Sequence, residues 1–277
     1  MKYILIILIS LLSCQLFAQD LNDNEELQII DLDKLFEPFK GSFILIDLQT
    51  DKKMVYNDSI SSKRYSPCST FKITNSLISL ESGVAKDESY TITYDSLKNP
   101  PKPWWYTTEP LIYWMQDHTM KTAIKYSVVW YYQELVRRIG EQDMQRLLNQ
   151  INYGNNDISS GIDNFWLCGS IKISAREQTD FLRKLYNQQL IGFSKQSQET
   201  VKNIMLYETT DNFKLYGKTG GGDCWDNKVI SWYVGFVETK SETYVFAMNM
   251  FVESFKDLGD KRIELTKKIL KELEIIE

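Results

Sequence analysis

Apolar residues recur with two different spacings along this 277-residue chain, one at its ends and another in its middle. Near the beginning, an apolar run, a polar turn and a second short run over 42–57 predict a β-hairpin. In the last third, the apolar segments 213–220, 228–239 and 242–253 follow one another with tight connections and predict three strands. The segment 260–276 then predicts a closing amphipathic helix.

Between these strands the apolar positions follow a helical spacing. They form one stripe over 69–80, and further helices are predicted on either side of Gly140 and over 174–190. The proline- and aromatic-rich segment 99–110 predicts a loop instead.

This order of elements predicts an α+β fold. We expect an antiparallel β-sheet built from both chain ends, flanked by helices, with a mostly helical subdomain inserted into it. The sheet subdomain is expected over 19–64 and 196–277, and the helical subdomain over 65–195. The length of 19–277 suits one catalytic domain.

The first residues, 1–18, have the pattern of a secretory signal peptide: Lys2, an apolar run and small residues. Cleavage after Ala18 would leave a soluble protein exported to the periplasm. A lipobox-like ending at Cys14 is the alternative, and it would leave a lipid-anchored protein. Beyond this segment, no apolar run is long enough to predict a membrane span.

Charge and composition narrow the function classes. The chain has 32 Lys and Arg against 37 Asp and Glu, and it has no basic stripe, so nucleic acid is not an expected partner. Its 7 Trp, 16 Tyr and 13 Phe favour a well-packed globule with a cleft over a disordered chain.

Cysteine and histidine add little that is specific. Without Cys14, three cysteines are left, and no pair has C-x-x-C spacing. We therefore expect small buried side chains or one incidental disulfide, and neither a disulfide framework nor a metal site. The only histidine, His118, is not accompanied by a G-x-S-x-G motif, so we expect it to be structural or exposed. The three remaining cysteines are Cys68, Cys168 and Cys224.

The strongest chemical candidate is the pair Ser69 and Lys72, which a helix would place on one face. Since no histidine is placed to take the proton of Ser69, Lys72 is the expected base. An ordinary lysine has a pKa of about 10.4 and is charged at neutral pH, but burial depresses that value.

Further motifs follow Ser69-x-x-Lys72 in a fixed order. They are S-x-V with Ser127 and Val129, expected within the helical region, Y-G-N at 153–155, F-W-L with Trp166, K-T-G at 218–220, expected at the end of a strand, and Arg262 at the start of the last helix. Together they resemble the class D (oxacillinase-type) serine β-lactamases within the penicillin-recognising fold. The resemblance runs from about Ser42 to the C-terminus. Two neighbours of the motifs depart from the pattern, because Cys168 stands where a polar or acidic residue is expected and Trp130 where many members have proline.

The resemblance implies a role for each matched residue. Ser69 is the nucleophile that the lactam carbonyl acylates, and Ser127 passes a proton to the leaving nitrogen. The backbone N–H groups of Ser69 and Gly221 form the oxyanion hole. Lys218 counts among the catalytic residues with Ser69, Lys72 and Ser127. It also binds the substrate carboxylate, together with Thr219 and Arg262, and Gly220 and Gly221 lie against the substrate.

The resemblance also implies that the neutral amine of Lys72 adds CO2 to become a carbamate, with the indole N–H of Trp166 as its donor. Phe71, Val129 and Trp166 are then the apolar residues expected to line the pocket of this base. No other cofactor and no metal is expected. The implied activity is the hydrolysis of β-lactams. A β-lactam sensor and a penicillin-binding peptidase or transpeptidase are the alternatives, and Val129 and Trp166 favour the hydrolase.

Overall fold

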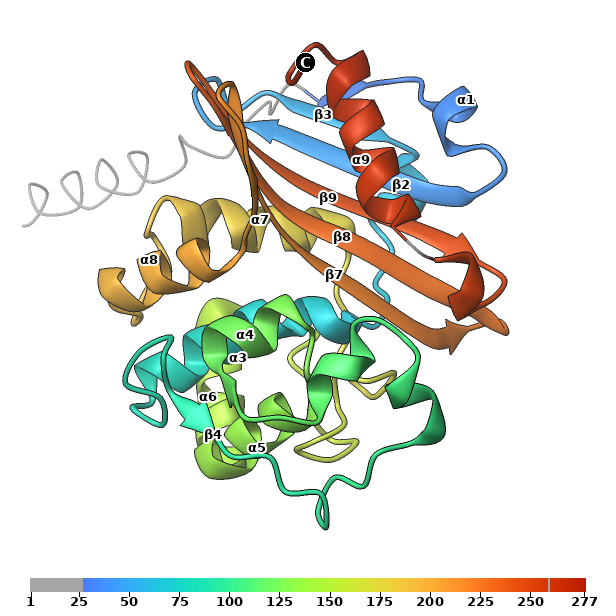
Figure 1. Ribbon diagram of the computed structural model, residues 1–277. Coiled ribbons are helices and arrows are strands. Elements are labelled where there is room, and N and C mark those ends of the chain that lie inside the picture. The colour runs from blue at the N-terminus through green and yellow to red at the C-terminus, as the bar shows by residue number, and fades with distance from the viewer. Residues whose placement is uncertain (1–26, 259) are drawn as a thin grey trace, which may run out of the picture.

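The computed structural model of the protein describes residues 27–258 and 260–277. A seven-stranded sheet forms its centre, with the strand order β1-β3-β2-β9-β8-β7-β6 (Figure 1). Neighbouring strands run antiparallel, except that β1 pairs with β3 in parallel. The strands are β1 (Leu27–Ile29), β2 (Lys40–Asp47), β3 (Lys53–Tyr56), β6 (Leu206–Thr209), β7 (Phe213–Trp225), β8 (Lys228–Thr239) and β9 (Thr243–Val252).

A strand from the first part of the chain, β2, pairs with a strand from the last part, β9, in the middle of this sheet. β2 pairs with β9 from Lys40 opposite Phe251 to Asp47 opposite Tyr244. Nearly every residue of β8 and β9 is buried, because helices cover both faces of these central strands. This double burial explains why their sequences are almost continuously apolar.

Helices pack on both faces of the sheet (Figure 1). On one face α1 (Asp33–Phe36) and α9 (Lys261–Glu272) cover a core that includes Phe246 and Ile269. On the other face α7 (Ala175–Tyr186) packs against β2 and β9, beside α8 (Lys195–Ile204). This second core is the larger one, and it continues into the helical part of the chain.

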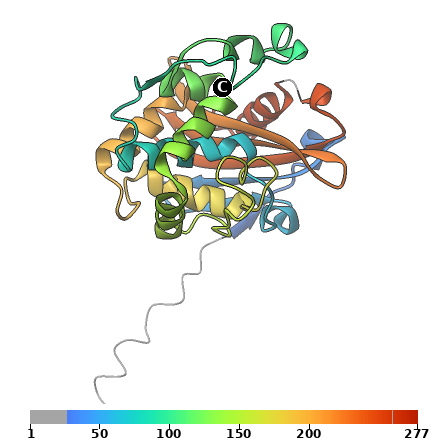
Figure 2. The ribbon, with the colours of Figure 1, turned by 90° about the horizontal axis from the view of Figure 1, so that it is seen from below.

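The helical part is organised around α3. Figure 1 shows α3 below α7 and α8, with α5 and α6 on its far side, and Figure 2 shows the same helices from below. Nine of the eleven residues of α3 are buried, and they include polar ones such as Lys72 and Asn75. The buried surface of α3 is therefore wider than the apolar stripe in its sequence. The short helix α2 (Asp58–Ser61) packs against β2 and β3 of the sheet. The elements of the helical part are α3 (Phe71–Glu81), α4 (Met120–Lys125), α5 (Val129–Ile139), α6 (Glu141–Ile151), and the strand pair β4 (Thr91–Ile92) and β5 (His118–Thr119).

The predicted α+β fold is confirmed. The hairpin, the helix after Ser69, the helices flanking Gly140 and the last strands and helix all appear. One placement is wrong, because K-T-G lies in the middle of β7 and not at a strand end. The subdomain boundaries stay a prediction, and the signal peptide and Cys14 lie outside the described residues. Among the residues described, no helix has the length and apolar character that a membrane span requires.

Candidate active site

Ser69 lies on a single 3-10 turn, Cys68–Thr70, that leads directly into α3. Pro67 precedes this turn, and its carbonyl accepts hydrogen bonds from both the backbone and the side chain of Thr70. Tyr65 is joined to Ile173 by two backbone hydrogen bonds, which fix the approach to the turn. The turn thus presents Ser69, which stays partly exposed, at the N-terminal end of a buried helix.

Lys72 lies one turn further along and is completely buried. Its Nζ is hydrogen-bonded to Ser69 Oγ at 2.8 Å. Burial lowers the pKa of Lys72 to about 7, because a buried charge loses its hydration. The amine is therefore neutral in a large fraction of molecules at neutral pH, and a neutral amine can take a proton from Ser69.

Tyr132 is a neighbour of this base that the sequence analysis missed. Lys72 Nζ lies 5.6 Å from the centre of the Tyr132 ring, and Tyr132 OH is hydrogen-bonded to Ser76 Oγ. Tyr132 follows Val129 by three positions on α5, so helical spacing from Val129 was the signal that could have identified it.

Trp166 is also completely buried, and its Nε1 has no hydrogen-bond partner among the described residues. Its ring stacks on Phe71, with the ring centres 5.6 Å apart. A buried donor without a partner costs about 1–3 kcal/mol, so this N–H is suited to an acceptor that the protein chain does not supply. Phe71 packs against Trp166 as an apolar wall, and Val129 is the first residue of α5.

Ser66 ties the Trp166 segment to the segment of the nucleophile. Its hydroxyl donates to the Trp166 carbonyl at 3.1 Å and accepts from the Cys168 backbone N–H at 3.1 Å. The Trp232 indole on β8 donates to the Ser66 carbonyl at 2.9 Å. One buried serine thus holds three segments in register, and sequence reasoning gave no signal for it.

The K-T-G segment of β7 lies directly against the nucleophile turn. A Cβ atom at Gly220 would lie 2.8 Å from the Pro67 carbonyl oxygen and 3.2 Å from the Thr70 nitrogen. Only glycine permits this approach, which brings the backbone of Gly221 into the neighbourhood of Ser69. The predicted pair of oxyanion donors is compatible with this placement and stays a prediction.

Lys218 is buried on the same strand, and its Nζ donates to the Thr219 carbonyl at 3.0 Å. Burial holds the pKa of Lys218 well below its usual range, and the positive charges of Lys72 and Arg262 lower it further. The three basic residues therefore act on one another electrostatically within one small region. A bound anion would offset the repulsion between these basic groups, so the region favours an anionic ligand.

Arg262 enters this region from the first turn of α9. Its Nη1 donates to the Gly220 carbonyl at 3.3 Å, while its buried Nε has no partner among the residues described. Burial lowers the pKa of Arg262 to about 10. The neighbouring Lys261 points elsewhere, since its Nζ lies 5.6 Å from the centre of the Phe39 ring.

Ser127 differs from its predicted setting. The sequence analysis placed it within a helical region, but it lies in the turn between α4 and α5 with a φ of 56°. A non-glycine residue in this left-handed conformation is strained, and such strain is found most often at functional sites. Its role as a proton relay stays a prediction.

His118 is structural, as predicted. It is buried, and its Nε2 and Nδ1 are hydrogen-bonded to the Tyr113 carbonyl at 2.8 Å and to Thr122 Oγ1 at 3.0 Å. Burial lowers the pKa of His118 below its ordinary value, which favours the neutral ring. Both ring nitrogens are occupied, so this histidine is not the base for Ser69.

One disulfide joins Cys168 to Cys224, which is one of the two outcomes that the sequence left open. Cys68 is a buried free thiol. The spacing of the cysteines gave no sign that all three would lie together.

Comparisons with known proteins agree with the geometry of the site, because the matching family and relatives are penicillin-binding proteins and β-lactamases. The family described as "Penicillin binding protein transpeptidase domain" matches residues 37–272. Over 247 residues the chain is 39% identical to "Probable beta-lactamase YbxI" of Bacillus subtilis, covering 89% of this chain and 86% of that protein. It is 40% identical to "Beta-lactamase OXA-48" of Klebsiella pneumoniae, covering 87% of each.

Proteins whose names do not include β-lactamase are similar as well. The chain is 35% identical to "Methicillin resistance mecR1 protein" of Staphylococcus aureus, covering 87% of this chain but only 39% of that protein. Among solved structures, the "C-terminal domain of the Bacillus licheniformis BlaR penicillin-receptor" superposes with a TM-score of 0.82 at 31% identity, covering 92% of this chain and 99% of that one.

A solved structure named "Class D beta-lactamase BAT-2" superposes with a TM-score of 0.79 at 38% identity, covering 90% of this chain and 97% of that one. Family match, identity, coverage and fold all lead to one assignment. The chain belongs to the transpeptidase-domain family of penicillin-binding proteins and, within it, to the class D β-lactamases.

Proposed function

We propose that the protein hydrolyses β-lactams through an acyl-enzyme formed on Ser69. The observation that carries this proposal is the buried amine of Lys72, which lies 2.8 Å from Ser69 Oγ and has a pKa of about 7. A serine next to a neutral base is an activated nucleophile. The anion-binding region formed by Lys218 and Arg262 suits the carboxylate that β-lactams carry beside the reacting ring.

In the first half of the reaction, Ser69 Oγ bonds to the lactam carbonyl carbon while Lys72 takes its proton. The carbon–nitrogen bond of the ring then breaks, and the nitrogen receives a proton through Ser127. In the second half, the base at Lys72 takes a proton from a water molecule, and the water oxygen attacks the ester carbon. The ester bond breaks, the base returns the proton to Ser69 Oγ, and the opened product leaves. The same base therefore serves acylation and deacylation.

We further propose that Lys72 is carboxylated by CO2. When bound, this group supplies an anionic oxygen base in place of an amine. The residues present fit it, because Lys72 is buried with a low pKa and Trp166 has a buried N–H without a partner among the described residues. Trp166 Nε1 would donate to the group, and Phe71 holds the indole in place by stacking.

Trp166→Phe tests this part of the proposal, since phenylalanine keeps an aromatic ring and removes the N–H. A hydrogen bond to a charged group is worth about 1.5–3 kcal/mol, so the bicarbonate concentration that gives half-maximal activity should rise by about 10- to 100-fold. Carbon-13 bicarbonate and NMR measure the carbamate directly. Activity that does not depend on bicarbonate in the wild type would leave a plain desolvated lysine as the base.

Arg262→Ala should raise KM by about 10- to 100-fold and change kcat by less than about threefold. The physical reason is that binding of a carboxylate stabilises the ground state and the transition state alike. Lys261→Ala is the matched control, because Lys261 is the neighbouring basic residue and lies over Phe39. A loss confined to kcat in Arg262→Ala would contradict this role.

A β-lactam sensor is the second candidate, and the similarity to MecR1 and to the BlaR receptor domain favours it. A sensor is acylated at the same serine but does not turn over. Pre-steady-state mixing with a chromogenic β-lactam separates the two functions. Continued turnover after one equivalent of product supports the hydrolase, whereas a single burst with a stable adduct supports the sensor.

A further inference from the structure

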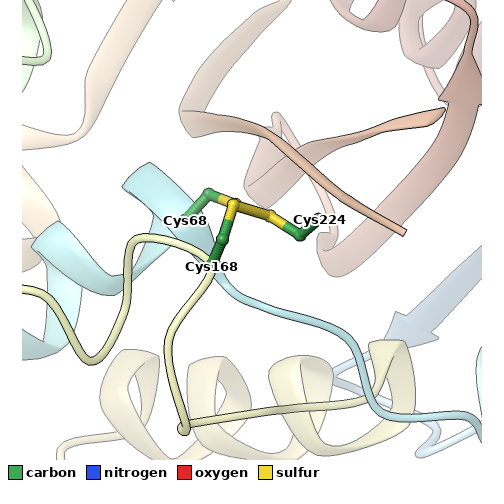
Figure 3. Close-up of side chains that lie close together, drawn as sticks. All are labelled: Cys68, Cys168 and Cys224. Carbon is green, nitrogen blue, oxygen red and sulfur yellow. A yellow bond between two sulfur atoms is a disulfide. The ribbon is translucent and has the colours of Figure 1, made fainter. Parts of the chain in front are cut away.

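Three cysteines that are distant in the sequence converge beside the nucleophile (Figure 3). Cys168 and Cys224 are joined by a disulfide, and the free Sγ of Cys68 lies 3.8 Å from the Sγ of Cys224. All three sulfur atoms lie within 4.8 Å of one another. We call these three residues the sulfur cluster. The catalytic proposal uses none of them.

Gly222 provides the space for the sulfur cluster. A Cβ atom at position 222 would lie 2.6 Å from the Sγ atoms of Cys68 and Cys224 and 2.8 Å from that of Cys168. The three sulfur atoms therefore surround one point above β7. Zinc–sulfur bonds are about 2.3 Å long, so three thiolates that converge in this way need only small shifts to share a metal ion.

Access and chemistry both favour a soft cation. Cys168 is exposed, Cys224 is partly exposed and Cys68 is buried, so an ion can reach the cluster from the side of Cys168. Because all three ligands are sulfur, the site selects thiophilic metals over Mg²⁺ or Ca²⁺.

We propose that the reduced sulfur cluster binds one soft, thiophilic divalent cation such as Zn²⁺. A dithiol reductant first breaks the Cys168–Cys224 bond, and two electrons and two protons convert it to two thiols while the dithiol becomes a disulfide. The cation then replaces the thiol protons, which pass to solvent. This inference is independent of the proposed hydrolase activity, and it departs from the sequence-based expectation that the chain has no metal site.

The site would connect three segments of the active site. Cys68 directly precedes Ser69, Cys168 follows Trp166 by two positions, and Cys224 lies on β7 with Lys218. A bound cation would hold these segments together in the reduced protein, as the disulfide does for two of them in the oxidised protein. Disulfide and metal exclude each other, since both use the sulfur atoms of Cys168 and Cys224.

Cd²⁺ is the probe for the experiment, because cadmium thiolates absorb in the ultraviolet by charge transfer. The purified protein is reduced with a dithiol, freed of it under anaerobic conditions and titrated with Cd²⁺. We expect a charge-transfer band that saturates at one equivalent, and no band in the oxidised protein. Cys68→Ser should weaken binding by at least about tenfold, because it removes one of three ligands.

Gly222→Ala is the matched variant, because it keeps all three thiols and pushes them apart. Its thiol titration should equal that of the wild type, while its Cd²⁺ affinity should fall by at least about tenfold. Circular dichroism tracks the fold of each variant, and Cys168→Ser, at an exposed ligand, gives a second reading with little risk to folding. Absence of a sulfur band in the reduced wild type, or equal Cd²⁺ affinity in the wild type and Cys68→Ser, would overturn the proposal.

Discussion

Ser69→Ala should abolish covalent labelling by a fluorescent penicillin and reduce hydrolysis of a chromogenic β-lactam by at least about 10,000-fold. Without Oγ no acyl bond can form, and the remaining groups can only bind the substrate. The fold should persist, because Ser69 lies on a short turn, is partly exposed, and alanine fits its backbone conformation. Denaturing gel electrophoresis after labelling gives the first measurement and stopped-flow absorbance the second.

Ser62→Ala is the control for this variant, since Ser62 is an exposed serine at the end of α2. It should label and hydrolyse like the wild type. Labelling of Ser69→Ala at the wild-type level would show that another residue is the nucleophile.

Lys72→Ala should slow acylation by about 100- to 10,000-fold, which is the range that a general base contributes. Any acyl-enzyme that does form should persist, because the base that activates water is also missing. Rapid-quench mass spectrometry follows both steps on the same sample. In the wild type, kcat/KM should fall as the pH drops below about 7, since Lys72, whose pKa is lowered to about 7, becomes protonated there and can neither take a proton nor react with CO2.

Bicarbonate provides the internal control for Lys72→Ala. It should restore activity to wild-type enzyme assayed in degassed, mildly acidic buffer, and it should restore none to the variant. Deacylation in Lys72→Ala at the wild-type rate would mean that the hydrolytic base lies elsewhere.

The elements that could be predicted from the sequence are those whose local pattern of apolar residues matches their burial in the fold. β8 and β9 are long apolar runs bounded by turns, so local pattern and final burial agree. The helix α8 was missed, because most of its residues are polar and it buries only a few apolar side chains such as Val201 and Ile204. Its place depends on packing against α3 and α7, which no local pattern contains.

In the site, too, contacts within one segment could be predicted and contacts between distant segments could not. Ser69 and Lys72 share one helical turn, so their contact could be predicted from spacing alone. Ser66, Tyr132 and the sulfur cluster bring together segments that lie 56 to 166 positions apart, so only the three-dimensional fold reveals them. The left-handed conformation of Ser127 could not be predicted either, because serine does not favour it. The junction of α4 and α5 imposes it.

The pairing of β2 with β9 sets the order in which this chain can fold. Ser42 N–H and Oγ both donate to Asn249 Oδ1, across a separation of 207 positions. Contacts of such high order carry a large loop-closure entropy and slow the search for the native state. A growing chain therefore leaves β2 without its central partner until the last strand is made, so folding follows synthesis of nearly the whole chain. A premature stop before β9 would expose the edge of β2 and favour aggregation over a stable fragment.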